Sequence, residues 1–284
     1  MIRDMKKVIR NVARSAVPVM LLAASVGRLQ SAETNAPIFT DANLEKAVRK
    51  FVFEKRDNDK PLVEADLVNL STIQGNGLGI TNLAGLEKCQ NLASLDLAKN
   101  KITDLQPLKT LAKIQYLNLA DNQIEGILPL SGVLALQYIE LSHNRVKDLR
   151  PLTGLTNLAS LYLSNNQISD LSPIVKFPKL ASLYLDNNQL KSIQDINSLT
   201  SLTTLSLNNN SISDLSPLDG LNGLYYLFLE NNKIRDLSPL VNMVKKDNDG
   251  PKRFAPFINI YLKGNSPKGG QISALKKTDA RVNN

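Results

Sequence analysis

The feature that most constrains this chain is an asparagine that recurs every 22 residues. The seven positions are Asn100, Asn122, Asn144, Asn166, Asn188, Asn210 and Asn232. Around each of them lies the same frame, with few departures: L-x-x-L-x-L-x-x-N-x-I-x-x-L-x-P-L-x-x-L. A unit this short cannot cover its own aliphatic side chains, so consecutive units must stack and share a continuous core.

The repeat extends beyond these seven asparagines. Eight contiguous units begin at Leu70, Leu92, Ile114, Leu136, Leu158, Leu180, Leu202 and Leu224. The first unit is degenerate, because Gly75 replaces a leucine and Leu78 replaces the asparagine. A ninth, partial unit follows after the frame slips by 11 residues, and its frame positions are Phe257, Ile260, Leu262 and Asn265.

The frame also predicts the direction of each side chain within a unit. In L-x-L-x-x-N the alternation has a period of two, so Leu161 and Leu163 should point inward while Tyr162 points outward. One short strand per unit, stacked in parallel, gives a continuous sheet. The asparagine side chain should bond to backbone groups that the following turn leaves unpaired. The proline after it stops any further strand, and the segment is too short for a full α-helix, which favours 3₁₀ turns or extended pieces.

The segments "ISDLSPL" and "NNQISDLSPL" resemble the internalin-like subfamily of bacterial leucine-rich repeat proteins, which are secreted or surface proteins. The resemblance implies an α/β fold: a right-handed leucine-rich repeat solenoid, horseshoe or arc, with a parallel concave β-sheet, a convex side of short 3₁₀ or extended pieces, and a helical N-terminal cap. It also implies recognition of another protein. We expect nine stacked strands, and no segment after the repeats resembles an immunoglobulin-like or wall-anchoring region.

The flanking segments predict five regions. Residues 1–32 have a basic stretch, a short apolar run and a cleavage site near Ala32, so we expect a signal peptide and an exported chain, secreted or periplasmic, without membrane insertion of the mature part. Residues 33–69 should form a helical N-terminal cap, with Thr40 or Asp41 as the helix N-cap. The eight repeats occupy 70–244, a basic insertion loop 245–256, and the last partial repeat with a C-terminal cap 257–284.

Composition excludes several classes of function. The net charge is +8, but residues 1–32 contribute +5, which leaves +3 for the rest and no case for nucleic-acid binding. One cysteine excludes an internal disulfide, and one histidine argues against a metal or catalytic cluster. We therefore expect neither an enzyme nor a cofactor.

Three polar features have structural explanations. Cys89 falls in an apolar column of the repeat, which predicts a buried thiol. His143 precedes a repeat asparagine at a surface position. A column of aspartates should cap the turn that follows each of them, rather than bind calcium. These are Asp104, Asp148, Asp170, Asp214 and Asp236.

The aromatic residues are the main indication of function. All seven tyrosines lie in or beside the strand columns, although threonine or valine would satisfy strand propensity equally well. We expect a contiguous exposed aromatic band, centred on units five to nine with an acidic rim, that binds a protein partner. Its residues are Tyr116, Tyr138, Glu140, Tyr162, Tyr184, Asp186, Tyr226, Phe228, Glu230 and Tyr261. The alternative is that the same face binds a cell-surface glycan. We expect a monomer.

Overall fold

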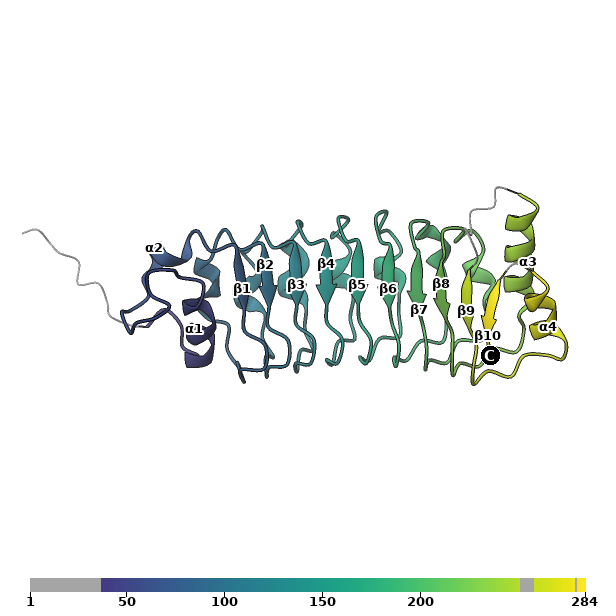
Figure 1. Ribbon diagram of the computed structural model, residues 1–284, viewed down its shortest axis with the longest axis horizontal. Helices are drawn as coiled ribbons and strands as arrows, with labels where there is room; N and C mark the ends of the chain where they lie inside the picture. Colours follow the sequence, from purple (N-terminus) through teal and green to yellow (C-terminus); the bar gives the residue numbers. More distant parts are fainter. Residues whose placement is uncertain (1–36, 251–257, 279) are drawn as a thin grey trace, which may run out of the picture. The chain divides into compact units, whose positions relative to one another are not determined.

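A computed structural model of the chain describes residues 37–250, 258–278 and 280–284. The expected signal peptide and Phe257 therefore lie outside the described residues. Ten strands form one parallel sheet whose spatial order is the sequence order, β1 to β10, as Figure 1 shows. The strands are β1 Thr72–Gln74, β2 Ser94–Asp96, β3 Tyr116–Asn118, β4 Tyr138–Glu140, β5 Ser160–Tyr162, β6 Ser182–Tyr184, β7 Thr204–Ser206, β8 Tyr226–Phe228, β9 Asn259–Tyr261 and β10 Arg281–Asn283.

Each strand has the alternation that the repeat predicts. The middle residue of every strand from β1 to β9 is buried, and the flanking residues are partly or more fully exposed in all of these strands except β7. The register places equivalent residues of successive units side by side; Leu161, for example, pairs with Ile139 and Leu183. The core is almost entirely aliphatic, and Phe177 is its largest fully buried side chain.

Short 3₁₀ helices return the chain between strands, and in Figure 1 they lie behind the sheet. They are η1 Leu86–Lys88, η2 Gln106–Leu108, η3 Leu128–Gly132, η4 Arg150–Leu152, η5 Ser172–Ile174, η6 Ile196–Ser198 and η7 Ser216–Leu218. The expected aspartate caps are present. In each of the five, one carboxylate oxygen accepts a hydrogen bond from the backbone N–H two residues later.

Helices close the repeats at both ends. At the N-terminal end, α1 (Ala42–Arg49) and α2 (Glu64–Leu67) precede β1. Asp41 is the N-cap of α1: its Oδ1 accepts from the N–H groups of Asn43 and Leu44, and its Oδ2 accepts from the backbone of Thr81. One carboxylate therefore joins the cap helix to the first repeat. These hydrogen bonds outweigh partial burial and lower the pKa of Asp41.

Gly75 explains why the first repeat is degenerate. A Cβ atom at this position would lie 2.8 Å from the Cβ of Ala47 in α1 and 3.1 Å from Leu97. The leucine that the frame calls for would therefore occupy the space into which α1 packs. The repeat therefore departs from its frame at Gly75 because α1 packs against this position.

Two expectations about the C-terminal end are wrong. We expected nine strands, but Arg281–Asn283 forms a tenth, β10, which pairs with β9 after the short helix α4 (Gln271–Lys276). We expected a loop at 245–256, but residues 245–248 belong to α3 (Ser238–Asn248); residues 251–257 lie outside the described part. The eighth unit is not followed directly by another repeat. The turn at its proline, Pro239, is therefore extended into the full helix α3, and Leu240, Met243 and Val244 of this helix cover the end of the core.

Candidate functional site: the face of the sheet

The solvent-facing side of the sheet, called the sheet face below, consists of three columns that run across the strands. The first column is Thr72, Ser94, Tyr116, Tyr138, Ser160, Ser182, Thr204, Tyr226, Asn259 and Arg281. The second is Gln74, Asp96, Asn118, Glu140, Tyr162, Tyr184, Ser206, Phe228, Tyr261 and Asn283. The third lies two residues further along: Asn76, Ala98, Ala120, Ser142, Ser164, Asp186, Asn208, Glu230 and Lys263.

The aromatic side chains of this face form two groups of neighbouring rings, in which four pairs are stacked and two, Tyr138–Tyr162 and Tyr225–Tyr226, are tilted. The N-terminal aromatic cluster spans β3 to β6 and consists of Tyr116, Tyr138, Tyr162 and Tyr184. Its successive ring centroids are 4.5, 5.2 and 4.8 Å apart. The C-terminal aromatic cluster consists of Tyr225, which directly precedes β8, Tyr226 and Phe228 of β8, and Tyr261 of β9. Its ring centroids are 5.8, 6.1 and 4.5 Å apart along the group.

The expectation of one contiguous band centred on units five to nine is wrong. Strand β7 carries Thr204 and Ser206 in the two columns that hold rings elsewhere, and it separates the clusters. The first cluster also begins two units earlier than expected, because the ring of Tyr138 in the first column reaches that of Tyr162 in the second. Most of the rings are half-buried against one another. Tyr225 and Tyr226 are the most exposed, at 40% and 41%.

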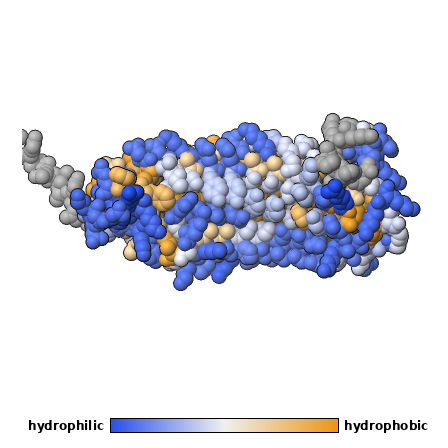
Figure 2. Space-filling view, in the orientation of Figure 1, coloured by the Kyte–Doolittle hydropathy of each residue, from blue (hydrophilic) through white to orange (hydrophobic). Residues whose placement is uncertain are grey.

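Figure 2 shows the middle of the sheet face in pale colours, between an orange area near α2 and β1 and another near β10 and α4. Pale colours fit a surface of tyrosine and serine, which is neither strongly apolar nor strongly polar. Such amphipathic surfaces, with ring carbons and hydroxyl groups exposed together, are typical of protein-binding faces.

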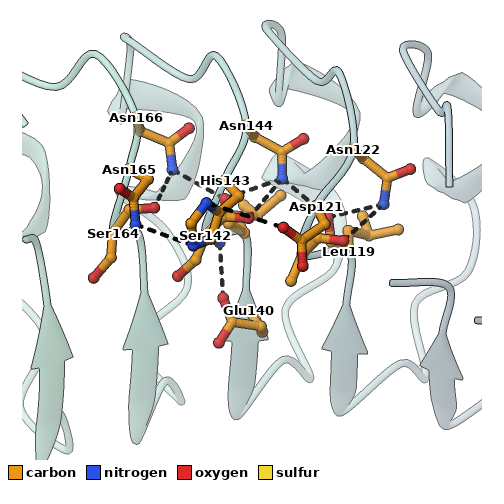
Figure 3. Close-up of polar contacts among 12 residues, drawn as sticks. Leu119, Asp121, Asn122, Glu140, Ser142, His143, Asn144, Ser164, Asn165 and Asn166 are labelled. Atoms are coloured by element: carbon orange, nitrogen blue, oxygen red, sulfur yellow. Dashed lines mark hydrogen bonds and ion pairs between the residues drawn. The ribbon is translucent and has the colours of Figure 1, made fainter. Parts of the chain in front are cut away.

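The acidic residues of the expected rim have different surroundings. Glu140 lies beside Tyr162 in the second column, and its Oε1 accepts a hydrogen bond of 2.7 Å from the N–H of Ser142, a contact drawn in Figure 3. Burial raises the pKa of Glu140, although the bonds from Ser142 oppose the shift. Burial also raises the pKa of Tyr116, Tyr138 and Tyr184, so these phenols stay neutral.

Asp186 and Glu230 flank Asn208 in the third column. Asp186 accepts hydrogen bonds from Ser206 Oγ at 2.6 Å, the N–H of Asn208 at 2.7 Å and Ser164 Oγ at 3.3 Å. The side-chain Oδ1 of Asn208 in turn accepts from the N–H of Glu230 at 2.7 Å. These bonds fix the backbone at the ends of β6, β7 and β8.

Beside the sheet face runs the asparagine ladder, which consists of the seven repeat asparagines; Figure 3 shows three of them, Asn122, Asn144 and Asn166, side by side in successive units. Asn144 Nδ2 donates to the carbonyl oxygens of Leu119 and Leu141, and its Oδ1 accepts from the N–H of Ile124. Every ladder asparagine repeats this pattern, so each side chain joins its own unit to the preceding one. Asn265 continues it in the ninth unit, with bonds to Leu229 and Leu262.

The column before the ladder contains a feature that the sequence reasoning missed. Seven residues there have φ between 53° and 59°, in the left-handed region: Lys99, Asp121, His143, Asn165, Asn187, Asn209 and Asn231. Asparagine, aspartate and histidine are the non-glycine residues most often found there, so the composition of this column was the available signal. In the ninth unit the position is Gly264, whose missing side chain makes room for the Asn231 carboxamide, 2.1 Å from an ideal Cβ.

His143 and Cys89 show no sign of catalytic chemistry. His143 is exposed, its Nδ1 lies 4.0 Å from Asp121 and its Nε2 lies 3.1 Å from Asn165 Nδ2, as Figure 3 shows. Cys89 is fully buried, and burial, with a smaller contribution from the charge of Glu87, raises its pKa to about 12, where a reactive thiolate does not form. Among the described residues no group of histidine, cysteine and acidic side chains is arranged to hold a metal ion. The described helices are all too short or too polar to cross a membrane.

Comparison with known proteins gives the relatives of this fold. A family model of two leucine-rich repeat copies matches residues 90–132, 134–173, 156–198 and 200–242. No curated protein sequence matches the chain. Among solved structures, an internalin C2 from Listeria monocytogenes is 34% identical with a TM-score of 0.72, and the match covers 80% of this chain and 95% of that one.

Two further structures are similar. An internalin from Listeria monocytogenes, inlF, is 30% identical with a TM-score of 0.75, and the match covers 87% of this chain and 71% of that one. A leucine-rich repeat protein of Leptospira interrogans has a TM-score of 0.62 at 21% identity, over 72% of this chain and 57% of that one, which is a likeness of fold alone.

Proposed function

Because this chain belongs to the internalin-like leucine-rich repeat proteins, we propose that it is a non-enzymatic recognition module that binds a protein partner through the sheet face. The observation that carries the proposal is the placement of the aromatic residues. All seven tyrosines of the sequence lie in or beside strands, and on the sheet face they gather into two stacked clusters. Tyrosine is among the residues that contribute most binding energy in protein interfaces.

The stacked arrangement supports binding in a second way. Rings that pack against each other at 4.5 to 5.2 Å, as in the N-terminal aromatic cluster, have already lost most of their rotamer freedom. A partner that covers them has little further side-chain entropy to remove, so more of the apolar contact contributes to affinity. Tyr116 and Tyr138 are hydrogen-bonded to each other, while the hydroxyl groups of Tyr162 and Tyr184 can form hydrogen bonds across the interface.

Glycan binding by the same face is the alternative. Sugars stack on open ring faces, but the rings of Tyr138 and Tyr162 each have a neighbour on both sides within the N-terminal cluster. Open faces remain only at the ends of the clusters, which favours a protein ligand that contacts ring edges and hydroxyls over a larger area.

We also propose that the protein acts outside the cytoplasm. The support is the sequence of residues 1–32, with its basic stretch, apolar run and cleavage site near Ala32. N-terminal sequencing of the protein recovered from the culture medium or periplasm of its producer tests this, and an intact Met1 there would contradict cleavage.

The test of the main proposal is a triple substitution of Tyr162, Tyr184 and Phe228 to serine. We expect an affinity pulldown from the native surroundings to lose its protein partner with this variant, provided that circular dichroism shows the fold intact. Phe53→Ser is the matched control, since Phe53 is an aromatic residue that is 77% exposed away from the sheet face. A partner that the triple variant still captures would refute the proposal. Binding of the native protein to a glycan array, without capture of any protein partner, would support the alternative.

A further inference from the structure

The sheet face contains a site that the proposed function does not by itself specify: the interruption of the aromatic row at β7. We propose that this interruption, called the β7 site, receives an arginine or lysine side chain of the protein partner. The β7 site consists of Tyr184 and Phe228 on either side, Ser206 between them, and Asp186 and Glu230 at one end. This inference rests on the proposed function, because it names the chemistry of the partner.

Tyr184 has one face without an aromatic neighbour, whereas Phe228 also stacks with Tyr226 of its own strand, at 6.1 Å. Tyr184 stacks on Tyr162 at 4.8 Å and Phe228 stacks on Tyr261 at 4.5 Å, and in both cases the neighbour lies on the side away from β7. The register places Ser206 between the two rings. Neighbouring strands lie ~4.8 Å apart, so the two ring-bearing strands are separated by roughly 10 Å. Ser206 is only 2% exposed, so a guanidinium group or a lysine stem would lie above the covered serine, beside the open face of Tyr184, where the quadrupole of the ring favours a cation.

The end of the β7 site is negatively charged. Asp186 and Glu230 lie two residues after the ends of β6 and β8, on either side of Asn208 in the third column. The described residues include no ion pair to either carboxylate. A cation from a partner would therefore meet two acids that the protein itself leaves without a counter-charge.

The charge of the whole sheet face also favours a cationic partner. From β2 to β8 the three columns hold four carboxylates, Asp96, Glu140, Asp186 and Glu230, and no cationic side chain. The first bases are Lys263 on the strand after Glu230 and Arg281 at β10. Complementary charge across an interface steers association and selects the partner, so a basic surface is the one this face accepts.

The acids are also held in place before any partner arrives. Ser206 is only 2% exposed, and its Oγ donates to Asp186 Oδ1, which also accepts from the N–H of Asn208. Asn208 Oδ1 accepts from the N–H of Glu230, which fixes the backbone of the second acid. A site whose charges are already positioned loses less free energy to ordering when it binds.

The experiment is a selection of random linear peptides displayed on phage against the full-length protein, with isothermal titration of the enriched peptides. We expect the enriched peptides to contain arginine or lysine beside apolar residues and to bind more weakly at high salt. Glu230→Gln removes a carboxylate that makes no side-chain hydrogen bond among the described contacts, and it should weaken binding about two- to fivefold. Combined with Asp186→Asn, which keeps an acceptor for Ser206, the loss should reach about tenfold.

Asp96→Asn is the matched control. It removes the same charge from the same face on β2, five strands from β7, and should leave peptide affinity unchanged. Enrichment of acidic or neutral peptides, no enrichment at all, or equal affinity of basic peptides for the native protein and the double variant would overturn the inference.

The failure of this inference is distinguishable from failure of the proposed function. If the double variant still captures a partner that the Tyr162, Tyr184 and Phe228 triple variant loses, the sheet face binds protein but the β7 site does not receive a cation. If the triple variant captures the partner as well, the sheet face itself is not the binding surface.

Discussion

Replacing Asn166 with alanine tests how the asparagine ladder stabilises the fold. In the native protein Asn166 Nδ2 donates to the carbonyl oxygens of Leu141 and Leu163 at 2.9 and 3.1 Å. A longer bond of 3.3 Å reaches the carbonyl of Ser164. Its Oδ1 accepts from the N–H of Val146 at 2.9 Å. The substitution Asn166→Ala removes all four bonds.

Most of the freed groups keep another partner. The carbonyl of Leu141 still accepts from Asn144, and that of Leu163 still accepts from Asn188. The third carbonyl has a backbone donor of its own. Only the buried N–H of Val146 loses its partner. Leaving one buried donor unsatisfied costs about 1–3 kcal/mol, so we expect the free energy of unfolding to fall by about that amount.

Asn100→Ala should cost more, because Asn100 is at the end of the ladder. The first repeat has Leu78 in place of an asparagine, so the carbonyl of Gly75 accepts a side-chain bond from Asn100 alone. The N–H groups of Leu78 and Ile80 also donate to Asn100 Oδ1. Asn100→Ala therefore leaves at least one more buried group without a partner than Asn166→Ala, and we expect an additional loss of about 1–3 kcal/mol.

The assay is urea unfolding of both variants, monitored by circular dichroism. The slope of the unfolding free energy against urea concentration is compared with that of the native protein, to confirm that unfolding exposes the same amount of surface. Equal destabilisation by the two variants would refute the reasoning that each ladder carbonyl is served by two asparagines. Unaltered stability of Asn166→Ala would refute the structural role of the ladder itself.

Three further predictions concern the cap and the turns. Gly75→Ala should destabilise the protein by about 1–3 kcal/mol in the same assay, because the added Cβ would lie 2.8 Å from Ala47; native stability would show that α1 can move away without cost. Lys99→Asn should raise stability by about 0.5–1 kcal/mol, since Lys99 has a φ of 59° that asparagine adopts more readily, whereas the control Lys101→Asn should not; equal effects would contradict the backbone explanation. Asp41 has a pKa below its unfolded value, so its contribution to stability is present above the unfolded pKa and is lost as the pH falls through the folded one; thermal melts of Asp41→Asn should lack that part of the acid dependence, and identical profiles would contradict it.

The strand positions and the core could be read from the repeat. A period of 22 residues with L-x-L alternation leaves one direction for each strand residue, and Leu161, Leu163 and Tyr162 have the directions expected. The aspartate turns and the burial of Cys89 followed from the same columns. Such inferences succeed because each position in a stacked repeat has the same neighbours in every unit.

The ends of the stack could not be read in this way. A terminal unit has a repeat on one side only, so other segments cover its core, and the frame contains no information about them. Gly75 in the first unit, the helix α3 and the strand β10 are all departures of this kind. The left-handed column before the ladder was a different omission, since its composition was visible but its backbone conformation was not inferred.

The sequence by itself therefore determined the fold family, the inward and outward columns and the position of the asparagine ladder, because these depend only on periodicity. The tertiary structure decided how the outward side chains meet. The ring of Tyr138 in the first column contacts that of Tyr162 in the second. Ser206 lies between Tyr184 and Phe228 and donates a hydrogen bond to Asp186. Which rings touch depends on side-chain rotamers and on the neighbouring unit, and these are properties of packing that no single repeat specifies.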